Sequence, residues 1–233
     1  MNNRETLPAT LYQDDHLLVI NKPPGLLSIP DGYDPDLPHL QTVLEPAFGR
    51  LWIVHRLDKD TSGTLVLARD ADTHRLLNEI FRNREIQKTY HGLVSPVPKW
   101  QTQTVETPLQ VNADRKHRTH AVPTGGKPAR SAFKVLKRFP EAALLEIKIK
   151  TGITHQIRAH LRSLELALLG DTLYQAGLVP PWVNADRVML HARELAFRHP
   201  IRDENMAFAA PYPDDFRETY TRLRFTRGPD TWL

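Results

Sequence analysis

The 233-residue sequence contains no cysteine, which excludes disulfide scaffolds, thiolate nucleophiles, iron–sulfur clusters and thiolate zinc sites. Long apolar runs are also lacking: the longest, such as residues 17–20, fall far short of the roughly 20 residues that a membrane helix needs. Residues 1–10 contain no apolar segment of the kind that marks a secretory signal. We therefore expect a soluble, cytoplasmic protein that makes no contact with a membrane.

Excess charge of either sign is scarce too, since 31 Lys and Arg stand against 27 Asp and Glu, for a formal net charge of +4. The basic residues are clustered, however, and the densest cluster lies in a stretch that also contains proline and glycine. Its candidate anion-binding residues are Arg115, Lys116, Arg118, Lys127 and Arg130. Two smaller basic clusters lie at residues 82–88 and 155–162. One cluster alone is typical of a solvated surface, but three favour contact with a phosphate backbone.

Strand-like segments outnumber helical ones. The predicted strands are residues 17–20, 64–68, 88–94, 145–149 and the segment around 195–197. Helices are predicted where apolar residues recur at helical spacing: after Asp72, after Thr154, and over residues 214–225. A proline-rich stretch between Gly25 and Leu40 predicts a long loop. Strands and helices do not alternate strictly, which favours an α+β fold with a largely antiparallel or mixed sheet.

A polar segment from His55 to Gly63 lies between apolar residues 51–54 and the predicted strand 64–68. Loops held between two buried elements often carry catalytic groups. Asp58 in this loop has three interpretations: a turn-forming aspartate, a metal ligand together with Asp60, or a lone catalytic carboxylate activated by a nearby arginine. The local sequence leaves all three open.

A second polar segment, residues 150–160, begins where a predicted strand ends. Gly152 permits a turn, and the start of the following helix offers backbone N–H groups to a phosphate. His155 and His160 are five residues apart, so they do not share a helix face as zinc ligands at i and i+4 do, and we expect no metal site. Arg158 lies on this helix, and its simplest interpretation is a solvated arginine.

These segments carry a resemblance to a known family. His-Arg-Leu-Asp-Lys-Asp-Thr-Ser-Gly, from His55 to Gly63, resembles the signature of the RluA family of pseudouridine synthases at every fixed position. Further segments resemble that family's other motifs in the same order: residues 14–25, 88–94, 151–161 and 190–192. The resemblance spans about residues 14–211. One departure is Ile153, where the family usually has arginine; we expect it to alter a phosphate or structural contact and to leave the chemistry intact.

The resemblance implies a role for each matched residue. Asp58 would be the catalytic carboxylate, acting as nucleophile or base. Arg158 would pair with Asp58 and keep it ionised and oriented. Tyr90 would stack on the target base and assist proton removal from C5, and Arg56 would fill the gap left by the flipped base. Candidate RNA-binding residues are Asn21, Lys22, His55 and the basic residues of 115–130.

The resemblance also implies an overall organisation. We expect residues 1–233 to form a single catalytic domain without an N-terminal S4 domain. Its fold would be a central, mostly antiparallel sheet with flanking helices and loops and a catalytic cleft across the middle. The expected partner is a stem-loop of ribosomal RNA, with transfer RNA as the alternative, and the expected state is a monomer without cofactor, metal or protein partner. Two rival functions are a catalytically silent RNA-binding protein on the same fold and a metal-dependent nuclease.

Overall fold

The computed structural model describes residues 7–225, which divide into two compact units. The first unit comprises residues up to 88 together with 192–211. The second comprises residues 89–191 together with those from 212 onward. Each unit has its own hydrophobic core, and two strands, β5 and β12, pass from one unit into the other.

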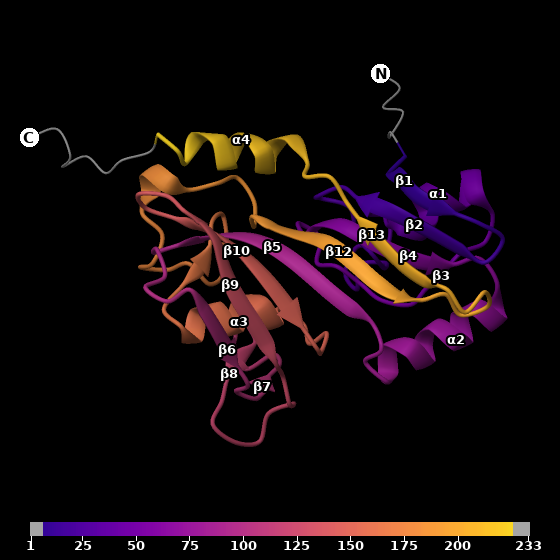
Figure 1. The fold of residues 1–233 in the computed structure, drawn as a ribbon, viewed down its shortest axis with the longest axis horizontal. Coiled ribbons are helices and arrows are strands. Elements are labelled where there is room, and N and C mark those ends of the chain that lie inside the picture. The colour runs from indigo at the N-terminus through magenta and orange to yellow at the C-terminus, as the bar shows by residue number, and fades with distance from the viewer. Residues whose placement is uncertain (1–6, 226–233) are drawn as a thin grey trace, which may run out of the picture. The chain divides into compact units, whose positions relative to one another are not determined.

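The first unit is built on a mostly antiparallel sheet (Figure 1). The strand order is β1-β2-β4-β12, with β3 pairing β4 and β13 pairing β12. The strands are β1 Ala9–Gln13, β2 Leu17–Lys22, β3 Trp52–Ile53, β4 Ser62–Ala68, β12 Leu190–Arg198 and β13 Asn205–Ala209. Two helices complete the unit, α1 Leu40–Phe48 and α2 Ala71–Arg82.

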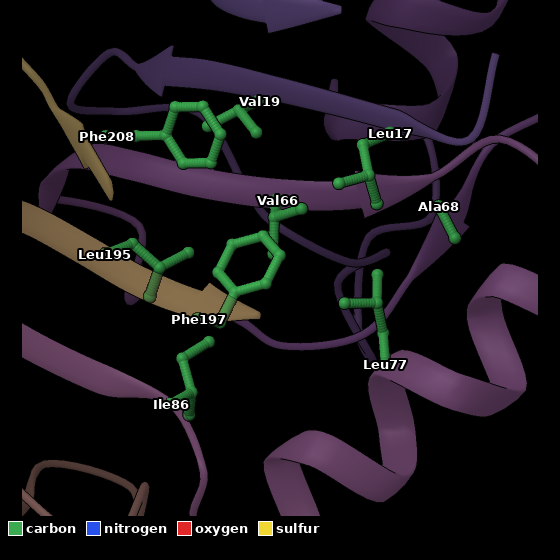
Figure 2. Close-up of a cluster of buried hydrophobic side chains, with 9 residues drawn as sticks. All are labelled: Leu17, Val19, Val66, Ala68, Leu77, Ile86, Leu195, Phe197 and Phe208. Carbon is green, nitrogen blue, oxygen red and sulfur yellow. The ribbon is translucent and has the colours of Figure 1, made fainter. Parts of the chain in front are cut away.

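The core of the first unit joins segments from both ends of the chain. Figure 2 shows Leu17 and Val66 from the central strands in one cluster with Leu77 of α2 and with Leu195 and Phe208 of the last two strands. Every residue of β4 is buried, so this strand has no solvent-facing side. Burial on both faces explains why residues 65–68 of this strand are continuously apolar and do not alternate with polar residues.

The second unit contains four strands in the order β5-β10-β9-β6, with the short β11 pairing β5, and the pairs β10-β9, β9-β6 and β11-β5 are antiparallel. The strands are β5 Gln87–Ser95, β6 Thr102–Val105, β9 Ser131–Arg138, β10 Ala143–Ile149 and β11 Ala167–Leu168. A separate hairpin is formed by β7 Leu109–Gln110 and β8 His120–Ala121. The helices are α3 Gln156–Ser163, a 3-10 turn at Pro181–Val183 and α4 Asp214–Arg222.

The expected α+β class with a mostly antiparallel sheet is confirmed, and the five predicted strands lie within β2, β4, β5, β10 and β12. Two predicted helix caps are wrong. Asp70, not Asp72, caps α2, because its carboxylate accepts the Thr73 N–H at 2.7 Å. Helix α3 starts at Gln156 after His155, whose φ of 55° is left-handed, so Thr154 is not its cap.

Candidate active site and RNA-contact residues

The loop that carries Asp58 leads from β3 into β4 in the first unit. Residues that follow β2 form hydrogen bonds with the backbone of this loop and so hold it in place. The Ser28 hydroxyl donates to the Leu57 carbonyl at 2.8 Å and accepts the Leu57 N–H at 3.1 Å. The Gly25 N–H donates to the Lys59 carbonyl at 2.9 Å. The backbone on both sides of Asp58 is therefore fixed, as a preorganised catalytic group requires.

Lys22 contributes to the same arrangement from the inside. Its side chain is fully buried, and its ammonium donates to the carbonyls of Pro23, Leu26 and Lys59 at 2.8, 2.8 and 3.0 Å. The predicted contact of Lys22 with RNA is therefore wrong for this structure. The ammonium is inaccessible to a phosphate and instead ties the first motif to the backbone beside Asp58.

His55 shapes the loop. Its Nε2 accepts the backbone N–H of Val66 at 3.1 Å, and its ring stacks on Phe81 at a centroid distance of 4.7 Å. Burial, and then the charge of Lys88, lower the pKa of His55 to about 3. The imidazole is therefore neutral at pH 7, and its contacts with Val66 and Phe81 give it a structural part in the loop, while its contact with RNA stays a prediction.

Gly63 ends the signature at a position that requires glycine. Its φ is +118°, and a Cβ added there would lie 2.2 Å from the carbonyl oxygen of Ala192 in β12. No side chain fits, because the neighbouring backbone approaches too closely. The last residue of the motif therefore permits β4 to pack against β12.

Asp58 itself is partly exposed, and Arg56 is exposed. The Thr61 N–H donates to the Asp58 carbonyl at 3.0 Å, so the backbone of Asp58 also forms a turn. Among residues 7–225 no three His, Cys, Asp or Glu side chains are grouped to hold a metal ion. The Asn21 amide donates to the Pro211 carbonyl at 3.1 Å and remains partly exposed.

The second unit contains Tyr90 and Arg158. Tyr90 lies on β5 and is buried. Arg158 lies on α3 and is also buried, so the interpretation as a solvated helix arginine is wrong. Its Nε and Nη2 donate to the two carboxylate oxygens of Asp171, both at 2.7 Å. A buried arginine held by two parallel bonds has a fixed plane, which a solvated arginine lacks.

The first part of the basic stretch, residues 115–118, lies in the loop between β7 and β8, whereas Lys127 and Arg130 lie between β8 and β9. Asp114 organises the loop between β7 and β8. Its carboxylate accepts from Arg118 Nε at 2.6 Å and from the backbone N–H of Lys116 at 3.0 Å, and it contacts His120 Nε2 at 2.9 Å. The hydrogen bond with His120, with further ones from Arg118 and Lys116, lowers the pKa of Asp114. Arg118 is thus committed to an ion pair, whereas Arg115 stays exposed.

Lys116, Lys127 and Arg130 are also exposed, and Arg130 pairs with Glu106 at 2.7 Å. The sequence interpretation missed Asp114, as well as Asp171 and Tyr174 beside Arg158. A charged residue directly after the apolar run 166–170 was the available signal for Asp171.

No helix among residues 7–225 is long and apolar enough to cross a membrane.

The predicted site residues are therefore divided between the units. Asp58, Arg56 and His55 belong to the first unit with Asn21 and Lys22. Tyr90, Arg158 and the basic stretch belong to the second unit. Within each unit the residues are brought together by contacts between segments that are distant in sequence.

Comparisons with known proteins agree on one class. The family model described as RNA pseudouridylate synthase matches residues 16–163. The chain is 36% identical over 204 residues to the dual-specificity RNA pseudouridine synthase RluA of Pasteurella multocida, covering 86% of this chain and 91% of that protein. It is 37% identical over 235 residues to the ribosomal large subunit pseudouridine synthase D of Vibrio vulnificus, covering 92% and 70%.

Among solved structures, the human RNA pseudouridylate synthase domain containing 4 is similar with a TM-score of 0.77 and 27% identity, covering 93% of each chain. Fold, motifs and relatives together define an RNA-modifying isomerase. The chain belongs to the RluA family of RNA pseudouridine synthases.

Proposed function

We propose that this chain, acting as a single catalytic domain, isomerises specific uridines in structured RNA to pseudouridine with Asp58 as its catalytic carboxylate. The observation that carries the proposal is the complete signature from His55 to Gly63. Support comes from the backbone hydrogen bonds to Leu57 and Lys59, which hold Asp58 in a fixed, partly exposed loop.

The reaction needs one carboxylate and no cofactor. The C1′–N1 bond breaks, the uracil rotates, and C1′ bonds to C5; the C5 proton is lost and N1 gains a proton, so product and substrate are isomers. A carboxylate can serve as the nucleophile at C1′ or as the base that removes the C2′ proton. Asp58 takes that part in either route, because it is the matched aspartate of the signature.

Three further residues assist the reaction: Arg158 acts on the Asp58 carboxylate, and Tyr90 and Arg56 act at the target nucleotide. Arg158 orients Asp58 and keeps it ionised, and its rigid pairing with Asp171 supports this assignment. Tyr90 stacks on the uracil and assists removal of the C5 proton. Arg56 is exposed and fills the space of the flipped nucleotide.

We propose RNA stem-loops as the substrate, with ribosomal RNA preferred and transfer RNA as the alternative. The exposed cations Arg115, Lys116, Lys127 and Arg130 contact the phosphate backbone. The names of the relatives support both RNA classes, since one is a ribosomal large subunit enzyme and another has dual specificity. We further propose that the protein acts in the cytoplasm as a monomer.

The first experiment measures tritium release from RNA labelled at uracil C5, with a chelator present. Wild type and the control Asp15→Asn, an exposed aspartate of the same unit, should release tritium. Asp58→Asn should release none while its melting temperature and RNA affinity stay near those of wild type. Release by Asp58→Asn at the wild-type rate would refute the catalytic assignment. A wild type that binds RNA without release would indicate a silent binding protein, and inhibition by the chelator would indicate a metal enzyme.

A further inference from the structure

Asp171 forms a buried ion pair with Arg158 inside the second unit. The Asp171 side chain is fully buried, and that of Arg158 is 10% exposed. Besides Arg158, Asp171 Oδ1 accepts the backbone N–H groups of Leu173 and Tyr174, each at 3.2 Å. The carboxylate is thus fixed by the turn that follows Gly170. A guanidinium that is paired with a buried carboxylate is poorly suited to bind a mobile phosphate. Because Nε and Nη2 are held by Asp171, the direction of Nη1 is fixed as well.

Tyr174 contacts the same arginine from another side. The Arg158 guanidinium carbon lies 4.8 Å from the centre of the Tyr174 ring, a cation–π contact. The Tyr174 hydroxyl accepts the backbone N–H of Thr119 at 2.7 Å and donates to the Thr119 carbonyl at 3.2 Å. It also lies 3.3 Å from His155 Nδ1. One buried side chain therefore contacts Arg158 through its face and the Thr119 backbone through its tip.

Thr119 is the residue where the basic loop returns to β8. Its neighbour Arg118 is held by Asp114 and lies within 3.5 Å of the Leu173 carbonyl. The Thr119 hydroxyl donates to the Thr154 carbonyl at 2.8 Å, just before α3. The base of the basic loop is therefore fastened both to the turn that carries Asp171 and to the start of the helix that carries Arg158.

We propose that Asp171 and Tyr174 are positioning residues for Arg158, and that Tyr174 couples contact of RNA with the basic loop to the orientation of that arginine. The inference rests on the proposed function, in which Arg158 acts on Asp58. Asp171 fixes the plane of the guanidinium, and Tyr174 fixes that plane relative to the backbone of Thr119. When RNA contacts the exposed side chains around Arg115, the shift of the loop reaches Arg158 through Thr119 and Tyr174.

The test separates the rate of the chemical step from RNA binding. Single-turnover tritium release at saturating enzyme, the Kd for the RNA and the melting temperature are measured for Asp171→Asn, Tyr174→Phe and the control Tyr220→Phe. Tyr220 is a tyrosine of the same unit whose ring contacts Phe139 and Arg224. Asp171→Asn and Tyr174→Phe should slow the step about 10- to 100-fold with a Kd within about twofold of wild type, because a misdirected catalytic group costs rate more than affinity. The control should match wild type.

Tyr174→Phe keeps both charges and the ring, so it carries the test if Asp171→Asn does not fold. A wild-type rate in folded Tyr174→Phe would overturn the positioning role. Arg158→Lys separates the two proposals: if it slows the step while Asp171→Asn and Tyr174→Phe do not, only the present inference fails. If Arg158→Lys reacts at the wild-type rate, the proposed role of Arg158 fails.

Coupling is tested by a double-mutant cycle between Arg115→Ala and Tyr174→Phe, read as the saturating single-turnover rate. Coupling predicts that Arg115→Ala slows the step in wild type and has no further effect in Tyr174→Phe. Independent, multiplying effects of the two substitutions would overturn the coupling, since non-contacting residues without a shared element behave additively.

Discussion

Lys22 is a cation that lies wholly inside the protein, with an exposed fraction of 0%. An ammonium removed from water is stable only when charge-assisted hydrogen bonds replace its hydration. Three backbone carbonyls, those of Pro23, Leu26 and Lys59, supply these bonds. The last belongs to the residue after Asp58, so at the scale of one residue Lys22 links stability to the geometry of the catalytic loop.

Lys22→Met should therefore destabilise the protein by about 2–5 kcal/mol, because it leaves buried carbonyls without donors. Tritium release should fall, and the salt dependence of RNA binding should not change. Arg115→Met is the matched control: stability should stay within about 0.5 kcal/mol, and the slope of log K against log salt should fall by about 1. Urea unfolding and RNA binding at several salt concentrations measure both. A stable Lys22→Met with a reduced salt slope would show instead that Lys22 contacts phosphate.

At the scale of one element, helix α2 begins with Asp70. Its carboxylate accepts from the Thr73 N–H and from the Thr73 hydroxyl, each at 2.7 Å, and contacts His16 at 3.1 Å. Burial by itself would raise the pKa of Asp70, but the hydrogen bonds from Thr73 and His16 outweigh it and lower the pKa to about 2. Asp72, in the first turn, is exposed and is not the cap.

Asp70→Ala should cost about 1–2 kcal/mol of unfolding free energy at pH 7, the loss expected for an N-cap. Asp72→Ala should cost about 0.5 kcal/mol, since it removes only a favourable charge near the helix dipole. The folded pKa of Asp70 lies below its ordinary value of 3.8, so its contribution is complete above about pH 4 and is lost as the pH falls toward 2. Urea unfolding of both variants from pH 7 to pH 3 measures this. Equal losses at pH 7, or a difference that grows as pH falls, would contradict the assignment.

At the scale of the whole molecule, the first unit is discontinuous in sequence. Its core combines Leu17 and Val66 from the N-terminal part with Leu195, Phe197 and Phe208 from residues 192–211. The chain completes this core only after passing through the second unit. The first unit is therefore made from two separate stretches of sequence, with most of the second unit between them.

A fragment of residues 1–88 should not fold by itself, because β4 would lack its neighbour β12 and the core would lack two aromatic rings. Circular dichroism and amide hydrogen exchange should show an unfolded or fluctuating chain. Adding a peptide of residues 190–211 should restore protection in β2 and β4, whereas the same peptide with Phe197→Asp should not. Full protection of the fragment alone would show that the first unit does not need its distant segment.

Much of this protein could be predicted from sequence, because strand periodicity and motif identity are properties of neighbouring residues. Apolar runs and alternation located β2, β4, β5, β10 and β12, because strand periodicity is written in consecutive residues. The signature from His55 to Gly63 identified the family, which the relatives confirm. The roles of Asp58, Tyr90 and Arg158 stay predictions until they are measured.

The sequence by itself determined the family, the fold class and the candidate catalytic residues. Only the tertiary structure decided what those residues touch: Lys22 meets the carbonyl of Lys59, Arg158 meets Asp171, and Tyr174 meets Thr119. Each of these contacts joins segments between 13 and 55 residues apart. The reason is physical. Chemical type and periodicity are properties of neighbouring residues, whereas burial and pairing depend on which distant segments the fold brings into contact.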